Sequence, residues 1–304
     1  MVDEHRPGWK VFLFTDVSGI PLQSFRDQLK ERGHEIVGML TAPPPRSRPD
    51  ANDYLDVVAT GAEMGIPTIV SNKRKEWPSL LRAFEPDLCI CAGFIWKIPA
   101  DVLEVPRLGT INIHAGKLPE YRGPDPVGWT FRNDEGALSV SAHFMTPEWD
   151  AGAVLAHNQI PYDDDSDIAD LFPMVIDDVV RVLDQAVDRV ENGEPGEQQD
   201  ESKAGYAPFF EPEWRQIDWT MPRRFIHNQV RSWIGPRDSP RGAIGSVDGT
   251  SFIVYKTRIE RDFAADGAAP GSVLSRESDS ILVQCADGPL RIVEWERATD
   301  DQSE

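Results

Sequence analysis

The residues best suited to chemistry lie in the short segment 110–119, Thr-Ile-Asn-Ile-His-Ala-Gly-Lys-Leu-Pro. If residues 110–114 form a strand, Asn112 and His114 project from the same face, because alternate side chains of a strand share a side. An amide N–H can hold a developing oxyanion, and an imidazole can take a proton from an amine. The pair therefore suits acyl transfer, although each residue alone could equally satisfy nearby backbone groups.

A carboxylate is still needed to orient or charge-balance the imidazole. Residues 145–152 follow the next expected strand and supply Asp150, just before Ala-Gly. An Asp in that position is also a common turn residue. We expect His143, in the preceding strand, to pack or face solvent. Cys89 and Cys91 share one strand face, as core fillers do.

Several other chemistries lack their motifs. The turn after the first apolar run, residues 15–21, has no GxGxxG, so a dinucleotide fingerprint is absent. The sequence has no GxxxxGK[ST] for phosphate binding, and neither HExxH nor paired CxxC. No metal site is therefore predicted.

The elements that position these residues alternate between strand and helix. Apolar runs at 11–14, 35–40, 67–70, 88–92 and 110–114 read as strands, and helical patterns at 21–32, 53–64 and 77–84 separate them. Such alternation implies βαβ units and a parallel sheet. Further strands at 139–145 and 154–160 precede a long helix at 168–190. We predict an α/β, doubly wound, mostly parallel sheet of Rossmann-like form.

The rest of the chain reads differently. Residues 194–205 are polar and rich in helix breakers, so we predict a linker there. It would join a catalytic domain at 1–193 to a C-terminal domain at 206–304. Short alternating runs in the latter favour a small β-barrel of OB-like form.

The composition is that of a soluble globular protein. The chain has 304 residues, 40% hydrophobic and 27% charged. No apolar run reaches the ~18 residues of a membrane helix, and the charged start lacks the apolar core of a signal peptide. The three cysteines fit a reducing compartment. We expect a cytoplasmic protein without membrane contact; the hydrophobic pattern demands no particular oligomeric state.

The unusual number is the net charge of −20, from 31 basic and 51 acidic residues. Such a field repels nucleic acid unless a patch is locally basic, and it also occurs in proteins of a high-salt cytoplasm. One stretch is locally basic, where six arginines oppose two aspartates: Arg215, Arg223, Arg224, Arg231, Arg237 and Arg241 against Asp218 and Asp238. It could be a solvated surface or a site for phosphate or RNA.

The sequence resembles the folate-dependent formyltransferases. The similarity rests on 112–114 (Asn-Ile-His), 118–126 with Leu-Pro, Tyr-Arg-Gly and Pro, and 150–152 (Asp-x-Gly). Residues 217–219, 226–231 and 270–273 also resemble the C-terminal domain shared by methionyl-tRNA formyltransferase and some amino-sugar N-formyltransferases. The resemblance covers most of the chain, in order.

The resemblance implies a mechanism and a formyl donor, 10-formyltetrahydrofolate. Asn112 would stabilise the tetrahedral oxyanion, and His114 would act in proton transfer with the attacking amine. Asp150 would hold His114 or the amine in the right charge state. The implied donor-binding residues are Phe94, Ile95, Trp96, Ile98, Asp163, Asp165 and Asp167. The acidic residues among them could instead form a solvated loop.

The formyl acceptor is the open question. Residues 115–117, Ala-Gly-Lys, stand where the family commonly has Pro-Ser-Leu, so the loops around the site differ. With the acidity, this favours a small-molecule amine such as an amino sugar. Methionyl-tRNA is the alternative, favoured by the arginine stretch and opposed by the net charge. A non-catalytic folate-binding protein and a formyltetrahydrofolate hydrolase are lesser alternatives.

Overall fold

The computed structural model describes residues 8–17, 19–44, 53–235, 241–260 and 267–298. They form two compact units. Unit 1 takes residues 1–124, 139–159 and 173–206, and unit 2 takes 125–138, 160–172 and 207–304. Two short internal segments, 125–138 and 160–172, thus group with the C-terminal part.

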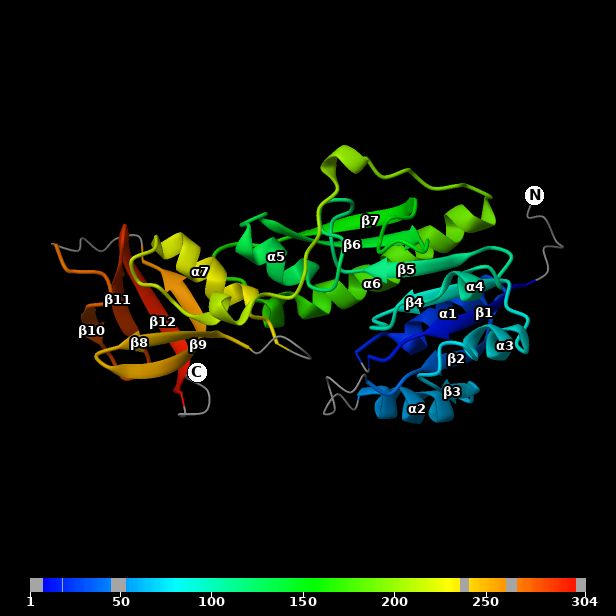
Figure 1. The fold of residues 1–304 in the computed structure, drawn as a ribbon, viewed down its shortest axis with the longest axis horizontal. Helices are drawn as coiled ribbons and strands as arrows, with labels where there is room; N and C mark the ends of the chain where they lie inside the picture. Colours follow the sequence, from blue (N-terminus) through cyan, green and yellow to red (C-terminus); the bar gives the residue numbers. More distant parts are fainter. Residues whose placement is uncertain (1–7, 18, 45–52, 236–240, 261–266, 299–304) are drawn as a thin grey trace. The chain divides into compact units, whose positions relative to one another are not determined.

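Unit 1 is built on a seven-stranded sheet of order β3-β2-β1-β4-β5-β6-β7 (Figure 1). The strands are β1 (Lys10–Phe14), β2 (Glu35–Thr41), β3 (Thr68–Val70), β4 (Leu88–Ala92), β5 (Thr110–His114), β6 (Ala137–Phe144) and β7 (Val154–Pro161). The first five are parallel, and β6 runs antiparallel to β5. The predicted mostly parallel α/β sheet is confirmed.

Helices cover both faces of this sheet. They are α1 (Leu22–Glu31), α2 (Asp53–Met64), α3 (Trp77–Arg82), α4 (Ala100–Leu103) and α6 (Ile168–Glu191). Trp77 of α3 and Val102 of α4 pack with Phe12 of β1 on one face. Arg32, at the end of α1, donates hydrogen bonds to Asp184 and Glu191, which places α6 beside α1. The central strands are continuous apolar runs because both of their faces are buried.

The strand order reverses between β1 and β4, and this positions the site. Open parallel sheets bind ligands at the carboxyl ends of the strands, near such a switch point. Here the relevant ends are those of β1, β4 and β5. The backbone N–H of Ile95, after β4, donates to Asp16, after β1, at 3.1 Å. The two loops at the switch point are therefore joined directly.

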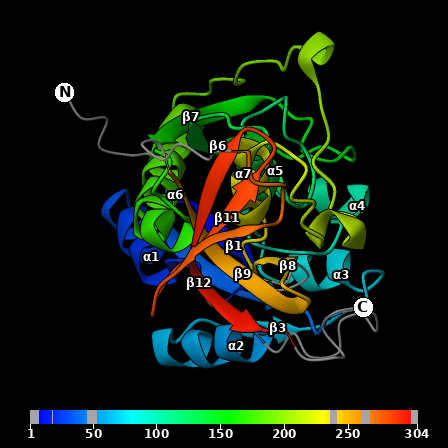
Figure 2. The same cartoon turned by 90° about the vertical axis from the view of Figure 1, so that its left-hand side faces the viewer.

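Unit 2 contains a five-stranded antiparallel sheet of order β10-β11-β12-β9-β8 (Figure 2). Its elements are α5 (Pro126–Arg132), η2 (Pro212–Arg215), α7 (Arg223–Ser232), β8 (Ala243–Val247), β9 (Thr250–Ile259), β10 (Val273–Arg276), β11 (Ile281–Cys285) and β12 (Gly288–Arg297). The expected C-terminal β-domain is thus an antiparallel sheet. Among the described residues no pairing of β8 with β10 closes it, and the OB-like barrel stays a prediction.

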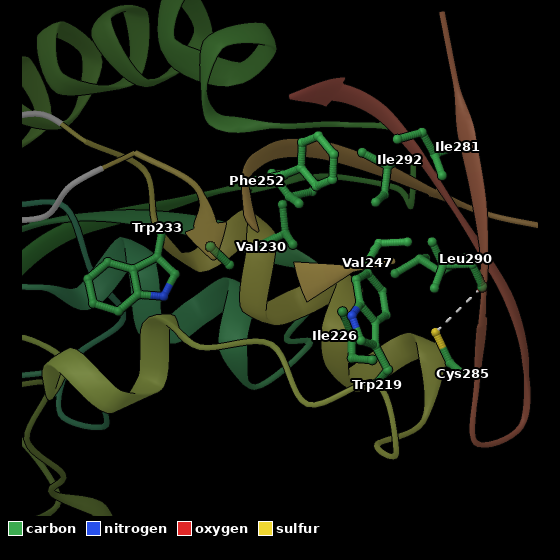
Figure 3. Packing of buried hydrophobic residues seen from close by; sticks show 13 residues of the cluster. Trp219, Ile226, Val230, Trp233, Val247, Phe252, Ile281, Cys285, Leu290 and Ile292 are labelled. Atoms are coloured by element: carbon green, nitrogen blue, oxygen red, sulfur yellow. Dashed lines mark hydrogen bonds between the residues drawn. The ribbon is translucent and has the colours of Figure 1, made fainter. Parts of the chain in front are cut away.

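One helix covers a face of this sheet. Ile226 and Val230 lie four apart on α7, hence on one side of it, and both are buried. They pack into a cluster with Phe252 of β9 and with Leu290 and Ile292 of β12 (Figure 3). This apolar cluster is the core of unit 2.

Residues 194–205, predicted as a linker, are bound to unit 1 along their length. Glu197 and Val154 exchange backbone hydrogen bonds of 2.8 Å in both directions. A 3-10 turn, η1 (Glu201–Lys203), follows, and Gly205 donates to the carbonyl of Pro119 at 3.0 Å. None of the helices in the described ranges is both long and apolar enough to cross a membrane.

Candidate active site

Asn112 and His114 stand at the carboxyl end of β5, as the sequence predicts. Asn112 pairs in register with Cys91 of β4 on one side and with His143 of β6 on the other. His114 lies opposite Ser141, whose hydroxyl donates to the carbonyl of Gly116 at 2.7 Å and fixes the turn after β5. The His114 side chain is buried, whereas Asn112 is half-buried.

Asp150 meets both of these side chains. Its Oδ1 accepts a hydrogen bond from Asn112 Nδ2 at 3.3 Å, and its Oδ2 lies 3.9 Å from His114 Nδ1. The backbone N–H of Gly123 donates to the same Oδ2 at 2.8 Å. The structure therefore brings the predicted amide, imidazole and carboxylate into one cluster within unit 1.

Two glycines let the backbone close around the carboxylate. Gly123 has a φ of 108°, a region that favours glycine, and points its N–H at Asp150. At Gly152 a Cβ would lie 1.7 Å from the carbonyl oxygen of Phe144. Only glycine allows the loop carrying Asp150 to lie this close to β6.

The hydrogen bonds of His114 identify its basic atom. Its Nε2 lies 2.7 Å from the carbonyl oxygen of Tyr121, which can only accept, so Nε2 carries the hydrogen. Burial lowers the pKa of His114 below 6.5, although the charge of Asp150 opposes this effect. The ring is therefore neutral near pH 7, with a free lone pair on Nδ1 toward Asp150.

Asp150 remains ionised in this setting. Burial alone would raise its pKa, but hydrogen bonding to His143, the charge on His114 and the Gly123 N–H together lower the pKa to about 2. A permanent carboxylate stabilises an imidazolium beside it. The cluster can thus receive a proton on His114 and balance the resulting charge.

His143 is a site residue that the sequence analysis did not assign. It is buried, and its Nδ1 lies 2.8 Å from the carbonyl oxygen of Phe144, which can only accept, so Nδ1 carries a hydrogen. Its Nε2 lies 3.1 Å from Asn112 Nδ2 and 3.5 Å from Asp150 Oδ1. The Asn112 amide nitrogen is thus in contact with both His143 and Asp150. The missing signal was the antiparallel register of β6.

The residues expected to bind the formyl donor fall into two sets. Phe94, Ile95, Trp96 and Ile98 follow β4 in unit 1. Phe94 packs against the rings of Phe14 and Trp77, each at 5.6 Å, while Ile98 is buried. The indole N–H of Trp96 is buried without a hydrogen-bond partner among the described residues. These side chains therefore lie at the switch point of the sheet.

The second set, the acidic residues, belongs to unit 2, where basic side chains engage them. Asp165 pairs with Arg258 at 2.9 Å, and Asp167 pairs with Lys256 at 3.0 Å. Asp163 accepts hydrogen bonds from Ser166, and these lower its pKa. The run is a structured acidic loop joined to the C-terminal part of unit 2.

The arginine stretch is likewise engaged within unit 2. Arg224 binds the carboxylate of Asp164, and Arg223 donates to the backbone carbonyl of Glu260. Arg231 donates to the carbonyl of Asp163 at 2.9 Å. Arg215 donates to backbone carbonyls, and Arg241 pairs with Glu294. Arg237 and Asp238 lie outside the described residues.

Among the residues that the structure describes, no group of three or more His, Cys, Asp or Glu side chains could hold a metal ion. Cys89 and Cys91 are buried free thiols, and burial raises the pKa of both. They pack in the core of unit 1 with Phe12 and Trp77.

Comparison with known families gives two matches along the chain. Residues 10–187 match the family described as formyl transferase, and residues 210–303 match its C-terminal domain. The methionyl-tRNA formyltransferase of Geobacter metallireducens is 31% identical over 88% of this chain and 85% of its own. That of Trichlorobacter lovleyi is 31% identical over 96% of this chain and 90% of its own.

Solved structures agree at the level of the fold. A sugar 3N-formyl transferase, WlaRD, superposes with a TM-score of 0.68 and 14% identity, covering 96% of this chain and 98% of its own. HypX from Aquifex aeolicus, in complex with tetrahydrofolic acid, gives a TM-score of 0.64 and 21% identity over 96% of this chain and 44% of its own. The predicted resemblance to formyltransferases is confirmed.

The expectation of a small-molecule acceptor is wrong. It rested on the net charge of −20 and on the altered residues 115–117, whereas the curated relatives at 28–32% identity are methionyl-tRNA formyltransferases. The physical reason is that a nucleic acid responds to the local field, which a whole-chain sum does not describe. Many of the acidic side chains are also neutralised by ion pairs, as in the loop at 163–167.

Proposed function

Since the chain belongs to the formyl transferase family, we propose that it moves a formyl group from 10-formyltetrahydrofolate to the amine of methionyl-tRNA. The main support for methionyl-tRNA as the acceptor is the length over which the chain aligns with its relatives. The methionyl-tRNA formyltransferases align over 88–96% of this chain, and so across both units. The chain is a formyltransferase in either case.

In the proposed reaction the amine attacks the formyl carbon, and two side chains of β5 and one of the loop between β6 and β7 act. Asn112 Nδ2 donates to the oxygen that gains negative charge, and this bond replaces its contact with either Asp150 or His143. His114 Nδ1, the unprotonated atom, takes a proton from the amine and returns it to the folate nitrogen as the carbon–nitrogen bond breaks. Asp150 balances the transient imidazolium from 3.9 Å.

The loop after β4 is the proposed seat of the folate. It lies where parallel sheets bind ligands, and β4 pairs with β5 up to Ala92 and Ile113. Phe94, Ile95 and Ile98 supply apolar surface for a pterin, and the Trp96 N–H, which has no acceptor in the described part of the chain, could donate to a folate carbonyl. Asp163, Asp165 and Asp167 have internal partners, so in this proposal they shape a loop rather than bind the ring.

The C-terminal sheet is the proposed contact for tRNA outside the methionyl end. We propose that this sheet has an OB-like form, which binds nucleic acid on its strand face. Methionyl-tRNA is used in translation, which takes place in the cytoplasm, so the proposed location is the cytoplasm. This assignment depends on the acceptor and is tested with it.

The test is formyl transfer with purified full-length protein, 10-formyltetrahydrofolate and charged initiator methionyl-tRNA. We expect one formyl-methionyl-tRNA per tetrahydrofolate released. Asn112→Ala should lower kcat about 100–1,000-fold, the usual cost of losing one oxyanion donor, with little change in the KM for the folate. Asn158→Ala, a matched change on β7 of the same unit, should keep kcat within about twofold.

Two results would overturn the proposal. One is formylation of nucleotide-linked amino sugars with no formylation of methionyl-tRNA. The other is tetrahydrofolate release that is equally fast with and without the tRNA, because this would show hydrolysis. Equal activity of Asn112→Ala and wild type would instead remove Asn112 from the mechanism.

A further inference from the structure

The backbone of Asp150 is held in an uncommon conformation. Its φ is 50°, in the left-handed region that costs a residue with a side chain about 1 kcal/mol or more. Such a conformation persists only where the surroundings enforce it. The proposed mechanism requires it, because it sets where the carboxylate points relative to His114.

The enforcing contact comes from Gln199, in the segment predicted as a linker. Its Nε2 donates to the carbonyl of Asp150 and to the carbonyl of Gly152, both at 2.7 Å. Its Oε1 accepts from Arg122 Nε at 3.0 Å and from Nη2 at 2.8 Å. An amide has two N–H groups and two lone pairs, so all of its bonding capacity is used.

These partners also fix the orientation of the amide. Backbone carbonyls only accept hydrogen bonds and a guanidinium only donates them, so the Gln199 group cannot be turned around. Its side chain thus joins three segments of unit 1: the loop of Arg122, the loop of Asp150 and the segment from Glu197 onward. A bidentate contact to arginine adds geometric precision.

The same segments hold both ends of the aspartate. Gln199 binds the carbonyl of Asp150, and Gly123, next to Arg122, binds its carboxylate Oδ2 at 2.8 Å. Arg122 is itself anchored by Glu201, with Nη2 to Oε1 at 2.6 Å. A displacement of Gln199 would therefore release the main chain of Asp150 and disturb the contact of its side chain.

We infer that Gln199 is a positioning residue of the catalytic site: with Arg122 it holds Asp150 in the left-handed conformation that directs its carboxylate to His114. The role of Asp150 rests on the proposed function, whereas the geometry does not. Gln199 bonds the backbone of Asp150 and Gly152 and the side chain of Arg122, so it acts on the site through the position of Asp150.

The sharpest variant is Gln199→Glu, which keeps the shape and the acceptor for Arg122 but removes both donors. Two carboxylate lone pairs would then face two carbonyls, and the loop of Asp150 would move. We expect kcat to fall about 10–100-fold with the folate KM within about twofold, since the loss is in aligning the reacting groups. With Asp150 displaced, the pKa of His114 loses the charge that raises it, so the acid limb of the pH–rate profile should move to lower pH.

The matched control is Gln28→Glu. Gln28 also donates from Nε2 to a backbone carbonyl in unit 1, that of Val180 at 3.2 Å, but it lies on α1. This variant also replaces an amide by a carboxylate, but at a position that has no contact with the loop of Asp150. We expect it to lose thermal stability while its acid limb matches that of the wild type. Arg122→Lys, which loses the forked contact to Gln199, should reproduce the Gln199→Glu shift in weaker form and serves if Gln199→Glu does not fold.

A second readout separates this inference from the proposed acceptor. The titration of the His114 ring, followed by NMR with labelled histidine, needs no substrate. If the wild type fails to formylate methionyl-tRNA while the His114 midpoint is lower in Gln199→Glu, the acceptor is wrong and the positioning role stands. If a folded Gln199→Glu has the wild-type midpoint, and the wild-type kcat where there is activity, the positioning role is overturned.

Discussion

His114 sets the pH at which the proposed site can act. Its basic atom is Nδ1, because Nε2 donates to Tyr121, and burial lowers its pKa below 6.5. A general base must be unprotonated, so activity should be lost as the pH falls through this lowered pKa. The ionisation of Asp150, with a pKa of about 2, does not limit activity in that range.

We therefore predict that the acid limb of kcat/KM has a midpoint under 6.5. The measurement is the rate of tetrahydrofolate release from pH 5 to 8 at limiting methionyl-tRNA. An acid limb centred at or above 6.5 would show that a group other than His114 controls the rate, and activity that rises as the pH falls would show that His114 acts in its protonated form.

The sequence predicted three of the site residues and missed two others for definite reasons. Asn112 and His114 follow from strand alternation, and Asp150 from its place after the next strand. His143 faces Asn112 only because β6 pairs antiparallel with β5, and the register of that pair has no local signal. Gln199 lies in a polar segment whose composition is that of a linker, so only its tertiary contacts distinguish it.

At the scale of elements, the apolar runs of unit 1 predicted its strands well, because strands buried on both faces have a continuous pattern. Unit 2 was harder to predict. Its acidic loop at 163–167 and its arginine-rich helix α7 each look like a solvated surface in sequence. The structure pairs them, so the charges of one element are partners for the other.

These pairs should differ greatly in their contribution to stability. The Arg231 side chain is 4% exposed. It donates to the backbone carbonyl of Asp163 and to Asn228 Oδ1, and it lies over the rings of Phe131 and Tyr162. We predict that Arg231→Met lowers the free energy of unfolding by about 3 kcal/mol, because it leaves buried acceptors unpaired. Urea denaturation followed by tryptophan fluorescence measures this.

The control for this prediction is Arg258→Met. Arg258 and its partner Asp165 are 57% and 65% exposed, so solvent screens their attraction. The change should be within about 0.5 kcal/mol of zero. Equal losses in the two variants would mean that burial does not decide the strength of ion pairs in unit 2.

For the whole molecule, the charge of −20 remains the feature that a tRNA partner must overcome. Residues 1–205 carry −16 of it and residues 206–304 carry −4, so the acidity is concentrated in the first two-thirds of the chain. Counting charges predicted repulsion of nucleic acid and a small acceptor. A phosphate backbone, however, is bound by the few cations it touches, and their positions depend on the fold.

The salt dependence of the reaction tests how the protein reconciles its acidity with tRNA. Binding through three phosphates releases about three counterions, so log kcat/KM for methionyl-tRNA should fall with log salt at a slope of about −2.7. Between 50 and 200 mM salt the loss would be about 40-fold. The KM for the folate should change far less, because the contacts proposed for it after β4 are largely apolar. A flat profile for the tRNA would contradict binding through these phosphate contacts.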